Sequence, residues 1–288
     1  MTELAALESF RTADGRTLSY RREGTGPMLV CHPGGPGFSS RYFGDLAGLG
    51  EHFTLILLHP RGTEDSDRPA DAGAYTTADY VSDLDELRAH LGLERMLLLG
   101  HSHGGVVAAA YAAAHPDRVQ RLVLASTLAC FAEEHNAAME AGMNAKAGEP
   151  WYADARAALE DEQAGRFESD EELGALALRE FPFYFARYDE SGAAYLGTLR
   201  GEIPVADALL LFNNEIFTTF DLRPDLPNIN APTLVITGAD DFITGPLCAA
   251  DFDAIRNVTT VVLSDCGHFI FVEARDRFRA EVAQHLSE

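Results

Sequence analysis

An apolar run that ends in a serine-centred turn limits this chain to a few folds. The residues are Leu97-Leu98-Leu99-Gly100-His101-Ser102-His103-Gly104-Gly105, and a small-residue run with helical character (106–114) follows. Such a tight strand-to-helix turn, with the pattern G-x-S-x-G, needs glycine on both sides of the serine, because a Cβ there would clash with the strand or the helix. We therefore predict that the Ser102 hydroxyl projects from the carboxyl edge of a sheet, at a helix N-terminus.

Length and composition favour one large domain, or one domain with an insertion. The chain has 288 residues, of which 47% are hydrophobic, so that it can bury a large core. It contains no run of 18 apolar residues, and the segment Met1–Phe10 is polar and acidic, without a basic-then-apolar signal. We therefore expect a cytoplasmic protein that does not enter a membrane.

Charge and cysteine usage exclude further classes. The net charge of −23 argues against nucleic acid as a partner, because phosphate binding needs clustered Lys and Arg. Residues 133–190 alone hold 15 acidic against 5 basic side chains, a field that favours a cationic substrate over an anionic one. The four cysteines lack metal-type spacing, and we expect them to be buried thiols: Cys31, Cys130, Cys248 and Cys266.

Short β-rich runs alternate with helical patterns along the chain, which indicates an α/β sheet. The expected strands are Thr17–Arg22, Met28–Cys31, Phe53–Leu58, Met96–Leu99, Leu122–Ala125, Thr233–Thr237 and Thr259–Leu263. The expected helices are Thr77–Leu91, Val106–His115, Pro246–Ile255 and Ala274–Leu286.

The alternation stops near Cys130 and resumes near Pro232. The intervening stretch is rich in Ala and Glu and carries the aromatic cluster Phe181-Pro182-Phe183-Tyr184-Phe185. A helical insertion between two strands predicts a lid over the carboxyl edge of the sheet, where open α/β folds bind ligands. We assign residues 1–129 and 223–288 to the core and residues 130–222 to the lid.

The sequence supplies partners for a nucleophilic serine. A hydroxyl is a weak nucleophile at neutral pH and needs a base and a group that orients the base. Asp240 and Asp241 follow the expected strand at 233–237, and His268 follows the last strand, so all lie at the edge expected for Ser102. We predict Ser102 as nucleophile and His268 as general base and then acid, with one of the two aspartates holding the imidazole.

Two main-chain amides are candidates for stabilising the oxyanion that forms during acyl transfer. One is the N–H of His103, directly after the nucleophile. The other comes from the glycine-rich loop 32–37, where Pro33 and Pro36 lack an N–H, and we choose Gly35.

Histidines flank the nucleophile on both sides. His101 and His103 either touch the substrate or serve as structural neighbours of the turn, and the sequence favours the second interpretation. A metal site built from these two and His32 lacks a carboxylate or cysteine partner at suitable spacing, so we expect no metal.

The order Ser, Asp, His and three further motifs resemble the α/β-hydrolase superfamily along the whole chain, and within it the proline iminopeptidase-like family of serine peptidases. Pro33-Gly34-Gly35-Pro36-Gly37 matches the family's H-G-G-P-G except at its first position. Residues 59–66 keep Arg61, Gly62 and Ser66 of a D-x-R-G-x-G-x-S pattern, and Gly238 to Pro246 is similar to G-x-x-D-x-x-x-P with one extra residue. The resemblance implies a mostly parallel central sheet flanked by helices, a helical lid inserted between core strands, and Asp241 as the acid.

The resemblance also implies a site for a free substrate amine. Family members bind this amine with glutamates, one of them near the end of the lid, and Asn214-Glu215-Ile216-Phe217 is similar to that segment. Glu215 is therefore the candidate amine ligand. The chain departs from the family at three positions: His103 replaces an aromatic residue, Phe242 replaces a second glutamate, and Pro33 replaces a histidine. Strict specificity for an amino-terminal proline is thus not implied.

Together these features predict a serine hydrolase that acts through an acyl-enzyme on a small amide or ester, a small molecule or short peptide with a free amine on its acyl side, without a cofactor. One alternative is a carboxylesterase with no amine requirement. Another is a ligand-binding member of the fold without turnover, which usually lacks a member of the triad. The sequence specifies neither the substrate nor the oligomeric state.

Overall fold

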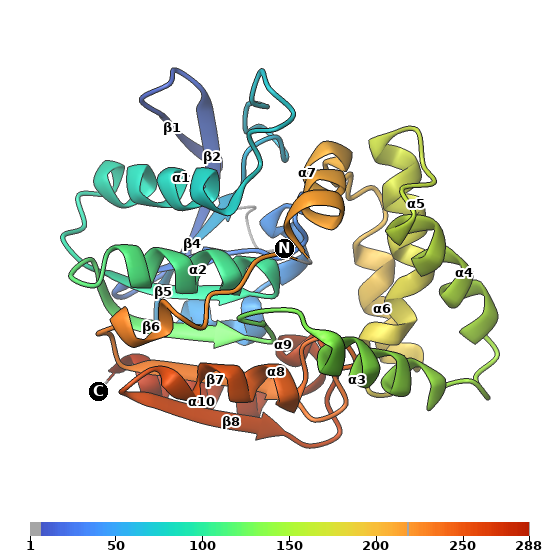
Figure 1. The fold of residues 1–288 in the computed structure, drawn as a ribbon. Coiled ribbons are helices and arrows are strands. Elements are labelled where there is room, and N and C mark those ends of the chain that lie inside the picture. Colours follow the sequence, from blue (N-terminus) through green and yellow to red (C-terminus); the bar gives the residue numbers. More distant parts are fainter. Residues whose placement is uncertain (1–6, 218, 288) are drawn as a thin grey trace.

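A computed structural model describes residues 7–217 and 219–287, with Glu215 and Ile216 described by their backbone only. Eight strands form one sheet in the order β1-β2-β4-β3-β5-β6-β7-β8 (Figure 1). The strands are β1 (Leu7–Arg11), β2 (Thr17–Gly24), β3 (Met28–His32), β4 (Thr54–His59), β5 (Met96–His101), β6 (Val119–Ala125), β7 (Thr233–Gly238) and β8 (Val258–Leu263). β1 and β2 are antiparallel to their neighbours and the other pairs are parallel.

The helices connect and cover these strands. They are α1 (Thr77–His90), α2 (His103–Ala114), α3 (Glu133–Asn144), α4 (Tyr152–Gln163), α5 (Asp170–Glu180), α6 (Glu190–Thr198), α7 (Ala206–Leu211), α8 (Pro246–Ala250), α9 (Ile270–Glu273) and α10 (Arg275–Ser287). Short 3₁₀ segments are η1 (Ser40–Phe43), η2 (Leu46–Glu51), η3 (Phe181–Tyr184), η5 (Leu226–Asn228) and η6 (Asp251–Ala254), and η4 (Phe212–Ile216) is a π-helical turn. No helix in the described ranges is long and apolar enough to cross a membrane.

The core lies in two layers because successive strand side chains point to opposite faces of the sheet. Leu98 on β5 belongs to the cluster formed with α1 and α2. Its neighbours Leu97 and Leu99 belong to the cluster formed with η1, η2 and α10. With both faces covered, the middle residues of β3, β4, β5 and β7 form continuous apolar runs, as buried parallel strands require.

The helices α3 to α7 lie between β6 and β7 in the chain. In Figure 1, α3, α4, α5 and α6 (green to yellow) stand beside the sheet rather than on either of its faces. The isolated bridge between Cys130 and Asp221 joins the start of this segment to its end. The segment therefore leaves the core and returns to it at one place.

The structure has all seven strands expected from the sequence, and adds β1. β1 went unpredicted because only Phe10 of its five residues is buried, so it shows no alternating apolar pattern. The helix expected at Val106–His115 begins earlier, at His103. Its start was not recognised because two glycines, which disfavour a helix, stand in its first turn. The helix expected at Pro246–Ile255 is α only to Ala250 and then continues as η6.

Candidate active site

The predicted strand-turn-helix element is present. β5 ends at His101 and α2 begins at His103, and the intervening Ser102 has φ 56° and ψ −126°. A positive φ is costly for a residue with a Cβ and persists only where the surroundings hold it. A Cβ at Gly100 would collide with the main-chain oxygen of Gly104 one turn later, which explains the glycines of the motif. Ser102 thus stands at the carboxyl edge of the sheet, partly exposed.

Asp241 and His268 meet at the same edge, after β7 and β8. The Nδ1–H of His268 donates to Oδ2 of Asp241 at 2.9 Å, and the Thr244 hydroxyl donates to the same oxygen at 2.7 Å. The amides of Ile243 and Thr244 donate to Oδ1. Burial alone would raise the pKa of Asp241, but the His268 imidazole and these hydrogen bonds lower it to about 2. Asp241 is therefore a fixed anion beside the imidazole, whose Nε2 lies on the ring edge away from it.

Asp240 takes no part in this contact. Its amide donates to the main-chain oxygen of Cys266 at 2.9 Å, and its side chain is exposed. Of the two aspartates that the sequence offered, only Asp241 lies within hydrogen-bonding distance of His268. Thr244, which the sequence analysis did not single out, completes the cluster; a threonine in a loop carries no signal by itself.

A cavity of about 100 Å³ opens beside these groups. Ser102 and His268 line it together with Gly35, and apolar side chains form much of the rest, among them Phe181 and Leu209. Nucleophile and imidazole therefore face one space large enough for a small acyl group.

The glycine-rich loop passes directly over the nucleophile. A Cβ built on Gly34 would lie 2.7 Å from Cβ of Ser102. The Gly34 amide donates to Oη of Tyr42 at 2.6 Å, whereas the Gly35 amide has no acceptor among the described residues. The His103 amide is the first of α2, where an N–H has no intrahelical acceptor. Neither of the two amides chosen from the sequence thus has an acceptor among the described residues, and their role as oxyanion donors stays a prediction.

The flanking histidines are buried neighbours of the turn. His101 is hydrogen-bonded to Tyr42 through Nδ1 (2.8 Å) and to the main chain of His268 through Nε2 (3.1 Å). The His103 ring packs edge-on against Tyr80 and Phe212, with ring centroids 5.3 and 5.0 Å apart. Burial lowers the pKa of both histidines to about 3, so both are neutral.

Two glutamates that the sequence analysis did not select also line the cavity. Glu162 comes from the end of α4 and is half-buried, and Glu180 from the end of α5 is 2% exposed. The two carboxyls are within hydrogen-bonding reach of each other, and Asn213 donates to Oε1 of Glu162 at 3.1 Å. Oε2 of Glu180 is buried and has no hydrogen-bond partner among the residues that the structure describes. Burial, with the charge of Glu162 added, raises the pKa of Glu180 well above 4.5. The sequence offered 15 acidic residues between 133 and 190 and no pattern that would single out Glu162 and Glu180 among them.

The side chain of Glu215 lies outside the described residues; its backbone belongs to η4. Its role as an amine ligand therefore stays a prediction. Phe242, at the position of the family's second glutamate, is buried against Phe183 and Tyr184.

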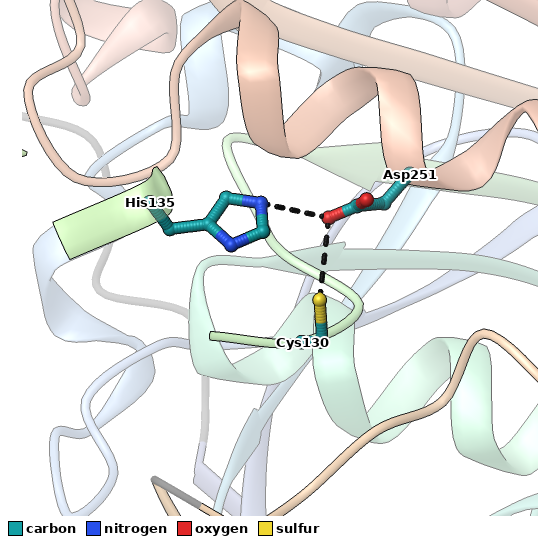
Figure 2. Close-up of side chains that lie close together, drawn as sticks. All are labelled: Cys130, His135 and Asp251. Carbon is teal, nitrogen blue, oxygen red and sulfur yellow. Dashed lines mark hydrogen bonds and ion pairs between the residues drawn. The ribbon is translucent and has the colours of Figure 1, made fainter. Parts of the chain in front are cut away.

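Figure 2 shows one further group of possible metal ligands, where α3 approaches α8 and η6. Oδ2 of Asp251 lies 3.0 Å from Nε2 of His135 and accepts from the Cys130 thiol at 3.5 Å. The Ala132 amide donates to Nδ1 of His135 at 3.0 Å, so the neutral ring carries its proton on Nε2. A metal-binding histidine normally donates from its other nitrogen to an acceptor. Among the described residues Nε2 of His135 has no hydrogen bond, although it lies close to Asp251. The arrangement therefore suits a buried polar contact at the base of the 130–222 segment better than a metal.

Comparisons with known proteins agree with this fold. A family model described as alpha/beta hydrolase fold matches residues 27–274. A proline iminopeptidase of Lactobacillus helveticus is 27% identical over 281 residues, covering 91% of this chain and 90% of that protein. Among solved structures, the proline iminopeptidase of Mycobacterium smegmatis has a TM-score of 0.72 at 25% identity, with 98% of each chain covered. The enol-lactonase of Burkholderia xenovorans LB400 has a TM-score of 0.74 at 26% identity, covering 98% of this chain and all of that one.

Proposed function

The chain belongs to the α/β-hydrolase family, and we propose that it is a serine hydrolase that cleaves a small amide or ester through an acyl-enzyme. The observation that carries the proposal is the meeting of the Ser102 turn with the hydrogen-bonded pair Asp241–His268 around one cavity. This arrangement provides a nucleophile, a base and an orienting anion at one edge of the sheet.

In acylation, Nε2 of His268 takes the hydroxyl proton as Oγ of Ser102 attacks the substrate carbonyl carbon. The negative charge that develops on the carbonyl oxygen is stabilised by the N–H groups of Gly35 and His103. Asp241 holds the imidazole by its Nδ1–H and stabilises its cation. The imidazolium then gives its proton to the leaving amine or alcohol, and the acyl group remains on Ser102.

Deacylation repeats the sequence with water in place of the hydroxyl. His268 takes a proton from the water, which attacks the acyl carbon, and then returns a proton to Oγ of Ser102 as the ester bond breaks. The product acid leaves and the enzyme is restored. No cofactor takes part in either half.

We further propose that residues 130–222 form a cap over a core of residues 1–129 and 223–288. The cavity supports this division, because its lining comes from both parts: Ser102 and His268 from the core, and Glu180, Phe181 and Leu209 from the cap. Such a cap encloses the acyl group and limits its size.

The acyl group that fits this cavity carries an amine. A buried glutamate is stable as an anion only with a positive partner, and neither Glu162 nor Glu180 pairs with a lysine or arginine within residues 7–217 and 219–287. A substrate ammonium would supply the missing charge to the unpartnered oxygen of Glu180. Glu215 is a further candidate for the same ammonium, on the family resemblance alone.

A fluorophosphonate probe tests the reaction class. We expect the wild-type protein to be labelled at Ser102, and to release a burst of nitrophenol from p-nitrophenyl acetate that is stoichiometric with enzyme. A folded wild-type protein that shows neither labelling nor turnover would instead be a ligand-binding member of the fold.

Matched substrates test the amine. Methyl esters of L-leucine and of 4-methylpentanoate differ only in the α-amine, as do those of L-alanine and propanoate. We expect the amino-acid ester to be preferred, and E180Q and E162Q to lower its kcat/KM by about 10- to 100-fold with little change for the amine-free ester. E171Q, an exposed glutamate on the same helix as Glu180, is the control. E215Q, assayed in the same way, decides whether that residue contributes.

A carboxylesterase is the second candidate, favoured by the apolar lining of the cavity and by the likeness to an enol-lactonase. It predicts equal rates for both members of each ester pair and no selective effect of E180Q.

A further inference from the structure

A four-residue segment of the 130–222 region, residues 183–186 at the end of η3, lies against the loop that carries His268. The His268 amide donates to the main-chain oxygen of Tyr184 at 2.7 Å. The Tyr184 ring stands edge-on to the His268 imidazole, with centroids 5.2 Å apart and planes at 77°. A Cβ on Gly267 would collide with this segment's backbone, so the backbone of the His268 loop is in direct contact with the backbone of the segment. The position of His268 therefore depends on where this segment lies.

Lys146, the only lysine of the chain, holds the segment from one side. Its Nζ donates to the main-chain oxygen of Phe183 at 2.9 Å and to that of Phe185. These two carbonyls flank Tyr184, whose own carbonyl is the one that accepts from His268. Phe183 and Phe185 are fully buried, so their carbonyls need partners that water does not supply.

Glu273 holds the segment from the other side. Its carboxylate accepts from the Ala186 amide at 3.0 Å and from the Gly267 amide, next to His268, at 2.7 Å. Lys146 and Glu273 also attract each other electrostatically, which opposes the lowering of the Lys146 pKa by burial. Four main-chain groups of this segment are thus hydrogen-bonded to Lys146, Glu273 or the His268 amide: the carbonyls of residues 183, 184 and 185 and the amide of residue 186.

We propose that Lys146 is a positioning residue for His268: its ammonium fixes the carbonyls on either side of Tyr184 and thereby sets the imidazole toward Ser102. Lys146 does not line the cavity that Ser102 and His268 share. The proposal rests on the function proposed above, since it concerns the base of that reaction. It assigns a role to a cation in a region whose net charge is strongly negative, and it couples the 130–222 region to the core through the backbone.

The test compares K146M, which keeps the length of the side chain but loses its charge and donors, with K146R, whose guanidinium can donate to both carbonyls. We expect K146M to lower kcat for p-nitrophenyl acetate and the rate of fluorophosphonate labelling by the same factor, about 10- to 100-fold, with KM within twofold. K146R should recover most of both rates. R187M is the matched control. It removes a cation beside the same segment, but the side chain of Arg187 is 86% exposed.

A structural role alone would lower the unfolding midpoint of K146M without changing the labelling rate of the folded protein, and that result would overturn the proposal. A K146M variant with a raised KM and an unchanged rate of fluorophosphonate labelling would also overturn the proposal. If K146M does not fold, E273Q weakens the same segment from its other side and should lower kcat and labelling in parallel; wild-type rates in E273Q would contradict the proposal. A wild-type protein that does not react with the probe would overturn the proposed function itself.

Discussion

His101 and His268, 167 residues apart in the chain, are joined by a hydrogen bond of 3.1 Å from Nε2 of His101 to the main-chain oxygen of His268. A carbonyl only accepts, so Nε2 carries the proton and Nδ1 accepts from the Tyr42 hydroxyl at 2.8 Å. That hydroxyl in turn accepts from the Gly34 amide at 2.6 Å. One buried chain of hydrogen bonds thus connects the glycine-rich loop, the strand before Ser102 and the loop of the proposed base.

Y42F tests this connection. Removing the Tyr42 hydroxyl leaves the Gly34 amide and Nδ1 of His101 buried without partners, and each such group costs about 1–3 kcal/mol. We expect the free energy of unfolding to fall by about 2–4 kcal/mol in urea titrations, and kcat to fall with it because both loops lose their anchor. Y188F is the control, since the hydroxyl of half-buried Tyr188 has no hydrogen-bond partner among the described residues. Equal stability of Y42F and wild type would contradict the role of the chain.

S102A removes the proposed nucleophile. If Ser102 and His268 act as one unit, turnover of p-nitrophenyl acetate should fall by about a million-fold. Circular dichroism and the unfolding midpoint should stay near those of wild type, because alanine also fits the turn in size. Activity of S102A near that of wild type would refute the acyl-enzyme mechanism.

D241N and D240N form a matched pair on neighbouring residues. D241N replaces the anion that holds His268 with a neutral amide, and we expect kcat to fall by about ten-thousand-fold. D240N changes an exposed side chain with no contact to the imidazole, so its kcat should stay within about threefold of wild type, the range expected of a surface substitution. The reverse order of effects would transfer the acid's role to Asp240.

E180Q should change how stability depends on pH. Because the pKa of Glu180 is raised in the folded protein above its ordinary value of 4.5, the native state binds more protons than the unfolded state above that pH. The protonated Glu180 side chain therefore contributes fully to the free energy of unfolding below pH 4.5, and this contribution is lost as pH rises through the folded-state pKa. The unfolding free energy of wild type should therefore fall from pH 5 toward pH 8 more steeply than that of E180Q, by about 1.4 kcal/mol per unit of pKa shift. Parallel curves from denaturant titrations would show that Glu180 is not held protonated.

Much of the fold could be predicted because its causes are local. The alternation of apolar strands with helical patterns placed seven of the strands, and the steric demand of the turn placed Ser102 between β5 and α2. The exception among the strands, β1, buries one side chain and is held by pairing with β2. A strand that is held by main-chain pairing alone cannot be recognised from its sequence when its apolar and polar residues do not alternate.

The site could be predicted only in part. The glycine motif and the strand ends brought Ser102 and His268 to one edge, but Asp240 and Asp241 differ only in how the loop after β7 turns. Glu162 and Glu180 lie on different helices, and neither has a motif that marks it. Lys146 was visible as a lone lysine, yet its contacts are to main-chain oxygens, which every residue has.

The sequence by itself determined the parallel sheet, the strained serine and the residues that could serve it, because glycine sterics and apolar periodicity act over a few neighbouring residues. The tertiary structure alone decided which glutamates share the cavity and which cation holds the segment beside His268. It also brought to the imidazole Asp241, which only the family resemblance had singled out over Asp240. These depend on how loops and helices far apart in the chain pack together, and the burial that results gives each group its charge and its partners.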